Sequence, residues 1–276
     1  MMKILVTGAN GYLGQGVVKT LLDKGVYVIA SDFQDDYIDK RANVKKCDLF
    51  SLEEPYEYFE EPDILLHLAW RDGFKHNSLA HVNDFPKHYQ FIKKMLDGGL
   101  KQFCGMGSMH EVGFFEGCID ENTQTNPMSL YGISKNALRQ ACQIMTEERD
   151  VVFQWIRGFY IVGNSDRGCS IFSKIELAER QKQKLFPFTT GTNQYDFIDY
   201  EEFCEQVVAV VMQNRIRGII NCCSGRPMKL SERVEQFIQE HNFTIKLEYG
   251  AFKDRAYDSK AVWGNDEKIK CIMMNR

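Results

Sequence analysis

The residues best suited to proton transfer are a tyrosine and a lysine four positions apart, Tyr131 and Lys135. On a helix such residues share one face, so the phenol and the ammonium lie one turn apart. A free tyrosine hydroxyl has a pKa of about 10. A neighbouring ammonium stabilises the phenolate and lowers that pKa. We expect Tyr131 to act as the acid/base and Lys135 to lower its pKa while holding sugar hydroxyls of a ligand. The alternative is a surface pair, because this spacing also arises by chance.

A serine supplies a third polar group. Ser108 follows the predicted strand Gln102–Met106. The carboxyl ends of strands face the ligand crevice in open α/β sheets, so this hydroxyl can hold a carbonyl oxygen while Tyr131 protonates it. The competing interpretation is a serine that forms a turn with Gly107.

A glycine-rich loop joins the predicted strand Lys3–Val6 to the predicted helix Gly11–Asp23. Glycines permit a tight turn and let the backbone approach a pyrophosphate at the positive end of the helix. The spacing G-x-x-G-x-x-G differs from the usual fingerprint, and a generic strand–helix turn is the alternative. We predict dinucleotide binding by this loop, through Gly8, Asn10, Gly11, Tyr12, Leu13 and Gly14.

Acidic residues after the next two strands indicate the cofactor. Asp32 follows the predicted strand Val26–Ala30, where a carboxylate accepts hydrogen bonds from ribose hydroxyls and repels a 2′-phosphate. NAD(H) is therefore favoured, and NADP(H) remains possible. Asp48 and Leu49 follow the weak strand Val44–Lys46, where the acid could meet the adenine amino group. A helix cap is an equally good interpretation of Asp48.

The elements that position these residues alternate between strand and helix, which predicts βαβ units and a parallel sheet covered by helices on both faces. The fold class is α/β, a Rossmann-like doubly wound sheet with a smaller C-terminal substrate-binding cap. We assign residues 1–157 to the nucleotide-binding domain, with later contributions from about 191–224, and 158–276 mainly to the cap. Further predicted elements are the strands Asp63–Leu68, Val151–Ile156 and Gly218–Cys223 and the helices His81–Leu96, Leu130–Arg149, Ile171–Gln183, Glu202–Gln213 and Leu230–His241, the last introduced by Ser231.

Composition limits the partners. The chain has 276 residues and a net charge of −4, which argues against nucleic acid or an anionic membrane as the main partner. Its nine cysteines form no C-x-x-C pair or ligand-like cluster, so we expect reduced thiols, no metal site and a cytoplasmic protein. The sequence contains no run of 18 consecutive apolar residues, so we expect no transmembrane helix.

Together these residues resemble the extended short-chain dehydrogenase/reductases that act on nucleotide sugars, over nearly the whole chain. The glycine loop and the Tyr/Lys pair are family-wide features. The segments Arg255–Asp258 and Trp263–Ile269 are similar to the narrower signature of enzymes that handle GDP- or dTDP-4-keto-6-deoxy sugars. Other residues in the family's order are His67, Leu68, Ala69, Arg157, Asp196–Asp199, Asn221, Ser224 and Gly225.

The residues after Ser108 narrow the reaction that the resemblance implies. Dehydratases of the family carry an Asp-Glu pair where this chain has Met109 and His110, and methionine cannot transfer a proton. Epimerase-reductases use a Cys and a His, which align with His110 and Ser165. Reduction of a 4-keto group needs only Ser108, Tyr131, Lys135 and a reduced nicotinamide. His110 is interpreted as a substrate contact or loop residue, with an acid/base role as the alternative.

The resemblance therefore implies NAD(P)H-dependent reduction of a nucleotide-linked (dTDP or GDP) 4-keto-6-deoxyhexose in deoxysugar or polysaccharide synthesis. The alternatives are a nucleotide-sugar epimerase, either a 4-epimerase with tightly bound NAD or an epimerase-reductase, and a non-catalytic NAD-binding regulator. Leu68 and Ala69 join the expected cofactor contacts, with His67 as a structural residue beneath the nicotinamide. The expected substrate contacts are Trp70, Arg71, Met109, His110, Tyr160, Arg226 and Arg255.

Two long helices, His81–Leu96 and Leu130–Arg149, predict the oligomeric state, because family members often pair such helices into a four-helix interface. We expect a homodimer, and the alternative is that these faces pack only on their own sheet. The apolar stripe on the second helix consists of Ala137, Leu138, Ala141, Ile144 and Met145.

Overall fold

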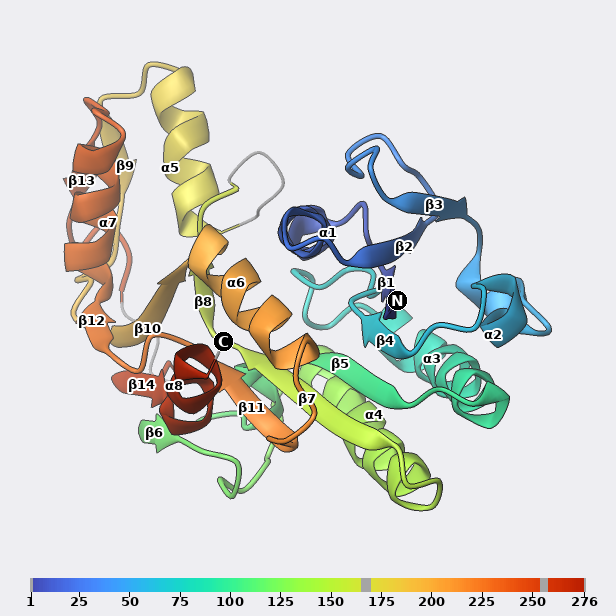
Figure 1. Cartoon of the computed structure of the whole chain (residues 1–276). Helices are drawn as coiled ribbons and strands as arrows, with labels where there is room; N and C mark the ends of the chain where they lie inside the picture. The colour runs from blue at the N-terminus through green and yellow to red at the C-terminus, as the bar shows by residue number, and fades with distance from the viewer. Residues whose placement is uncertain (1, 165–169, 254–257, 276) are drawn as a thin grey trace.

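The strands that precede the predicted site residues all belong to one parallel sheet. The computed structural model describes residues 2–164, 170–253 and 258–275. The strands of this sheet are β1 Lys3–Thr7, β2 Tyr27–Asp32, β3 Asn43–Lys46, β4 Ile64–His67, β5 Gln102–Ser108, β7 Val152–Gly158 and β11 Gly218–Cys222. Their order is β11-β7-β5-β4-β1-β2-β3, with every neighbouring pair parallel (Figure 1). The order reverses at β1, so the carboxyl ends of β1 and β4 border the crevice where such sheets bind ligands.

Helices cover both faces of this sheet, as the alternating pattern predicted (Figure 1). One face carries α1 Tyr12–Asp23, α6 Tyr200–Val211 and α8 Glu267–Met274, and the other carries α2 Pro55–Tyr58, α3 Ala80–Gly98 and α4 Leu130–Glu147. Gly25 follows the end of α1 with a φ of 74°, a conformation that costs glycine little. The α/β doubly wound prediction is confirmed.

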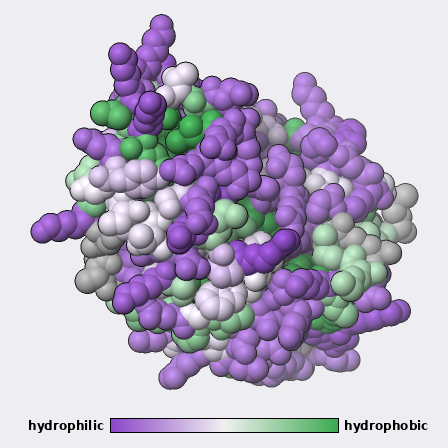
Figure 2. Space-filling model, turned by 90° about the vertical axis from the view of Figure 1, so that its left-hand side faces the viewer, coloured by the Kyte–Doolittle hydropathy of each residue, from purple (hydrophilic) through white to green (hydrophobic). Residues whose placement is uncertain are grey.

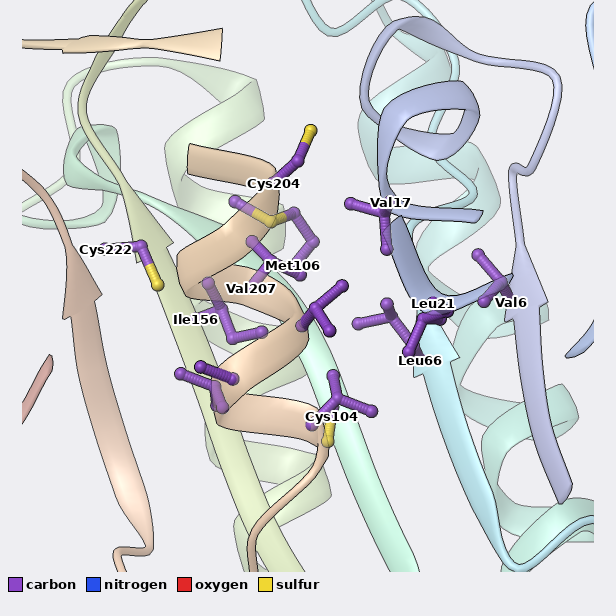
Figure 3. Packing of buried hydrophobic residues seen from close by; sticks show 14 of the residues in the cluster. Val6, Val17, Leu21, Leu66, Cys104, Met106, Ile156, Cys204, Val207 and Cys222 are labelled. Carbon is purple, nitrogen blue, oxygen red and sulfur yellow. The ribbon is translucent and has the colours of Figure 1, made fainter. Parts of the chain in front are cut away.

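The face under α1 and α6 forms a continuous apolar core (Figure 3). Side chains of α1, α6 and the central strands meet there, among them Val17, Leu21, Val207, Val6, Leu66, Met106 and Ile156. Polar contacts also join the two helices: the Tyr200 hydroxyl accepts a hydrogen bond from the Gly16 amide at 3.0 Å and donates to the Tyr12 carbonyl at 2.7 Å. These contacts fix α1, and with it the glycine loop that precedes α1.

A second, smaller layer is built mainly from the C-terminal part of the chain. Its strands are β6 Gly117–Ile119, β8 Tyr160–Val162, β10 Gln194–Asp199, β12 Pro227–Lys229 and β14 Ala261–Gly264, beside the pair β9 Leu185–Pro187 and β13 Lys246–Glu248. The helices α5 Ile171–Arg180 and α7 Leu230–Glu240 pack here. Figure 2 shows a mainly hydrophilic surface on this side of the molecule.

The two layers exchange segments of the chain. β6 comes from the first 157 residues but pairs with β14, whereas β11 and α8 come from the C-terminal part and join the parallel sheet and its helices. The buried carboxylate of Asp196 in β10 accepts hydrogen bonds from the Ser224, Gly225 and Gly264 amides at 2.8 to 3.0 Å. The segment that follows β11 is thereby tied to the β10 and β14 strands of the cap.

Two details of the sequence analysis are corrected. α7 begins at Leu230 with Lys229 as its N-cap, so Ser231 lies inside the first turn and does not introduce the helix. The stripe predicted on α4 is divided: Leu138 and Met145 are buried against the chain's own sheet, while Ile144 is 58% exposed. In the described ranges, no helix combines the length and apolarity needed to cross a bilayer.

Candidate active site

The glycine loop lies at the point where the strand order reverses, between the ends of β1 and β4. Gly8 has a φ of 71°, and a Cβ added to it would lie 2.6 Å from the Ala69 amide nitrogen. A Cβ on Gly14 would lie 2.2 Å from the Gly8 carbonyl oxygen. Gly11 is the N-cap of α1 and has no side chain to bond the free N–H groups of the first turn. This cradle fits a pyrophosphate, whose charge suits the N-terminus of α1.

The remaining residues of the loop are fixed by their neighbours. The Asn10 amide donates to the Asp32 carboxylate at 3.0 Å, and the Asn10 side-chain oxygen accepts from the Tyr37 amide at 2.8 Å. The Tyr12 hydroxyl donates to the Gly163 carbonyl at 2.9 Å, and Leu13 is half-buried beside the core. Asp32 therefore orders the loop while its half-buried carboxylate stands at the carboxyl end of β2.

Asp48 and Leu49 follow β3, the strand that pairs with the end of β2. The Asp48 carboxylate accepts a hydrogen bond from the Phe50 amide at 3.0 Å and caps the short helix η1, Leu49–Ser51. Leu49 is buried in the core under α3. Of the two interpretations given to Asp48, the structure shows the helix cap. Leu68 and Ala69 do follow β4 beside the glycine loop, and the Ala69 amide lies 3.4 Å from the Thr7 hydroxyl.

Ser108 ends β5 and is also the N-cap of the short helix η2, Met109–Glu111. Its hydroxyl accepts a hydrogen bond from the His110 amide at 3.3 Å, and its own amide donates to the Glu111 carboxylate at 2.8 Å. This reciprocal pair is a capping box, which fixes the orientation of the serine. The hydroxyl also interacts with the Tyr131 phenol.

Tyr131 and Lys135 lie one turn apart at the start of α4, as predicted. The Lys135 ammonium is 6.0 Å from the centre of the Tyr131 ring and donates to the Met106 carbonyl at 2.7 Å. Burial raises the pKa of Tyr131 to about 12, and the Ser108 hydroxyl opposes that shift. Burial lowers the pKa of Lys135 to about 7. The net shift of the Tyr131 pKa is upward in this arrangement, because desolvation is its largest cause and the ammonium is 6.0 Å from the ring centre.

A buried ion-pair cluster that the sequence analysis missed supports Ser108. The Glu111 carboxylate accepts from the Ser108 amide and, at 2.9 Å, from the Trp155 indole. Its second oxygen lies 3.7 Å from the Arg157 guanidinium and 3.9 Å from that of Arg139. Glu111 and Arg157 have no exposed surface. Only the S-x-x-E spacing of a capping box signalled this role.

Three histidine rings lie close to the Tyr131 ring. The His76 ring is stacked on the Tyr131 ring, with centroids 5.4 Å apart and planes 13° apart, and its carbonyl accepts from the Tyr131 amide at 2.9 Å. The centroid of the His110 ring lies 4.3 Å from that of His76 and 6.0 Å from that of Tyr131. The centroid of the His81 ring lies 5.3 Å from that of Tyr131. Sequence reasoning identified only His110, because the other two come from a loop and a helix distant in the chain.

The remaining predicted substrate contacts are dispersed. Trp70 faces Lys135 and Tyr131, whereas the Arg71 guanidinium is paired with the Asp84 carboxylate of α3. Met109 and Tyr160 belong to the apolar core of the cap, where the Tyr160 ring lies 4.5 Å from that of Tyr195. Arg226 is exposed at the start of β12, and Arg255 lies outside the described residues.

These features match a known family. Residues 4–223 match the NAD dependent epimerase/dehydratase family. The chain belongs to that family. Membership confirms the resemblance stated from the sequence and makes the chain an NAD-dependent enzyme of the epimerase/dehydratase type. It also agrees with the cradle formed by Gly8, Gly11 and Gly14.

Individual members of the epimerase/dehydratase family give closer comparisons. The dTDP-6-deoxy-L-talose 4-dehydrogenase (NAD(+)) of Aggregatibacter actinomycetemcomitans is 43% identical over 269 residues, which cover 95% of this chain and 99% of that protein. A UDP-N-acetylglucosamine 4-epimerase from Methanobrevibacter ruminantium M1 superimposes with a TM-score of 0.86 at 17% identity, covering 98% of this chain and 91% of that one. A UDP-glucuronic acid 4-epimerase from Bacillus cereus superimposes with a TM-score of 0.81 at 19% identity, covering 100% of this chain and 94% of that one. At these identities the two epimerases show only the shared fold.

The buried histidines predict that the protein loses stability in acid. Burial lowers the pKa of His88 to about 3 and that of His110 to about 4, whereas an unfolded histidine titrates near about 6.5. Between these values the unfolded chain binds protons that the folded chain does not, so the free energy of unfolding falls as the pH drops from about 6.5 towards 4. Each such histidine adds a slope of about 1.4 kcal/mol per pH unit.

Urea unfolding measured from pH 4 to pH 7 tests this expectation, with His110→Asn as the variant. In the variant, the slope of unfolding free energy against pH should be smaller by the contribution of about one proton, or about 1.4 kcal/mol per pH unit. The unfolding free energy of the variant should still fall as the pH drops. An equal slope in the variant and the unmodified protein would show that His110 is already protonated in the folded state.

Proposed function

We propose that this protein reduces the 4-keto group of a dTDP-linked 4-keto-6-deoxyhexose with NADH, giving a 6-deoxytalose-type product. The observation that carries the proposal is the convergence of Ser108 and a protonated Tyr131 beside Lys135 at the crevice of an NAD-family fold. The choice of dTDP and of C4 is supported by the 43% identical dTDP-6-deoxy-L-talose 4-dehydrogenase.

The geometry supports the proton-transfer part of this proposed reaction. A phenol with a pKa of about 12 keeps its proton at neutral pH, and that is the form needed to protonate a carbonyl oxygen as it becomes an alcohol. The Ser108 hydroxyl, which interacts with the same phenol, can donate a hydrogen bond to that oxygen. Bound NADH would supply the hydride, and the residues that would hold it are the glycine loop, Asp32 and Lys135.

A cavity in the cap gives room for the nucleotide end of such a substrate. It has a volume of about 440 Å³ and is lined by Ile171, Asn193, Tyr195, Leu230, Lys253 and Asp258, among others. Its lining combines apolar side chains such as Ile171 and Leu230 with polar ones such as Asn193 and Asp258, a mixture that suits a base and a sugar. Tyr160, a predicted substrate contact, packs on the Tyr195 wall.

The homodimer expected from the sequence remains a proposal, with a revised surface. Outward-facing apolar residues on α3 and α4 support it: Val82, Ile133 and Ile144 are 47%, 47% and 58% exposed. Sedimentation at micromolar concentration should give twice the chain mass of 32.0 kDa. Ile144→Asp should shift the mass towards the monomer, and a monomeric unmodified protein would contradict the proposal.

Replacing the proposed acid tests the reaction. Tyr131→Phe keeps the ring and its packing but removes the proton donor, so kcat with NADH and a dTDP-4-keto-6-deoxy sugar should fall by at least about 10²-fold. NADH binding, followed by fluorescence, and thermal stability should stay close to the unmodified protein. Lys135→Ala should weaken NADH binding as well as turnover.

Three results would contradict the proposal. Near-normal turnover by Tyr131→Phe would move the acid role to His110. Interconversion of C4 epimers by the purified protein without added NADH would indicate a 4-epimerase that retains NAD. Binding of NADH with no turnover of several keto-sugar nucleotides would indicate a non-catalytic regulator.

The choice between NADH and NADPH depends on Asp32. Its carboxylate also orders the glycine loop through the Asn10 amide, so two variants are needed to separate charge from loop support. Asp32→Asn keeps an acceptor oxygen but removes the charge that repels a 2′-phosphate. We expect it to narrow the NADH preference by about tenfold, or about 1.4 kcal/mol, whereas Asp32→Ala should also weaken NADH binding. A tenfold preference of the unmodified protein for NADPH would contradict this role.

A further inference from the structure

The ammonium of Lys135 lies deep in the protein against the face of an indole. Lys135 is 3% exposed, and its Nζ atom lies 3.9 Å from the centre of the Trp70 ring. Its hydrogen bond goes to the neutral Met106 carbonyl at 2.7 Å. Among the described residues it forms no ion pair. A buried cation without a paired carboxylate is costly, so the indole face and the carbonyl are the groups that compensate for its desolvation.

Two imidazoles in turn fix the indole. The Trp70 Nε1–H donates to Nδ1 of His81 at 3.0 Å, and the two rings are nearly parallel, at 14°. The His88 ring is also nearly parallel to the indole, at 17°, with centroids 4.5 Å apart. Because an indole N–H can only donate, Nδ1 of His81 must be the acceptor and its Nε2–H must donate to the Lys75 carbonyl, 3.0 Å away.

The same contacts continue to the glycine loop. His88 Nδ1 lies 2.8 Å from His67 Nε2, and His67 Nδ1 lies 2.8 Å from the Thr7 hydroxyl at the end of β1. Trp70 is therefore attached, through His88 and His67, to the strand that leads into the cofactor cradle. Its orientation is set by α3 and by two strands of the sheet rather than by its own loop alone.

We propose that Trp70 is a positioning residue for Lys135: its indole face, held by His81 and His88, keeps the ammonium protonated and in place beside Tyr131. The proposal builds on the role given to Lys135 in the proposed reaction. It assigns Trp70 to the lysine rather than to direct contact with the substrate, the role expected from the sequence.

The other groups that face Lys135 are neutral or distant, so they do not replace the indole in stabilising the ammonium. Tyr131 on its own helix is a neutral phenol, because burial raises its pKa to about 12. His67 of β4 and His88 of α3 are neutral as well, since burial and Lys135 lower the pKa of both. Glu111 of η2 attracts the ammonium from a distance. With the pKa of Lys135 lowered to about 7, a small loss of stabilisation changes its protonation near neutral pH.

A matched pair of variants separates the indole face from its bulk. Trp70→Phe keeps an aromatic face under the ammonium, and Trp70→Leu keeps an apolar side chain without one. The pKa of Lys135 is read by NMR of ¹³C-lysine-labelled protein without cofactor, with Lys135→Met identifying the signal. We expect Trp70→Leu to lower the Lys135 pKa by about one unit, or about 1.4 kcal/mol, and Trp70→Phe to lower it by less than about half as much.

The pH profile of turnover gives a second readout. If the protonated lysine is needed, the alkaline limb of kcat/KM in Trp70→Leu should move to lower pH by the same amount as the NMR titration. A Lys135 pKa that is unchanged in Trp70→Leu would overturn the proposal, because the indole face would then contribute nothing to it. An equal decrease in both variants would also overturn it, because the loss of bulk or of the N–H bond would then be the cause. The NMR result does not require turnover, so failure of the proposed reaction is recognised separately.

A fluorinated tryptophan keeps the test decisive if Trp70→Leu does not fold. Fluorine weakens the negative face of the indole with little change in shape. Introduced at position 70 by nonsense suppression, a multiply fluorinated indole should lower the Lys135 pKa in proportion to the number of fluorines. A constant pKa across that series would overturn the proposal.

Discussion

The candidate active site depends on the burial of one positive charge. Lys135 is carried inside by α4, where its ammonium meets a strand carbonyl, the indole of Trp70 and the distant carboxylate of Glu111. Burial, and to a smaller extent the nearby ammonium, lowers the pKa of His67 and His88, so both imidazoles beside this charge are neutral. The site thus combines a lysine whose pKa is lowered to about 7 with a tyrosine that keeps its proton at neutral pH.

Supporting residues hold this arrangement from two directions. On one side, Glu111 accepts hydrogen bonds from the Ser108 amide and the Trp155 indole and lies 3.7 and 3.9 Å from two buried guanidinium groups, so the serine is attached to the core of the sheet. On the other side, the contacts from Thr7 through His67 and His88 reach Trp70. The candidate site residues are therefore fixed by strands and helices, and a loop conformation alone does not define them.

Local rules accounted for much of the fold. The period of the apolar residues located α1, α3, α4, α6 and the parallel strands, because each of these elements buries one stripe or one continuous run against the sheet. These local rules did not locate the short strands of the cap. Strands such as β6, β8 and β12 are three residues long and exist only because distant segments pair with them, so no local periodicity marks them.

The sequence by itself determined the order of the glycine loop, Asp32, Ser108, Tyr131 and Lys135, since these positions follow strand ends and a helical spacing that are local properties. Only the tertiary structure decided what surrounds them. Five histidines from four separate segments meet near Tyr131 and Trp70, and Glu111 finds its arginines on β7 and α4. Burial then set the direction of the Tyr131 pKa, because desolvation depends on the whole packed environment and i, i+4 spacing does not reveal it.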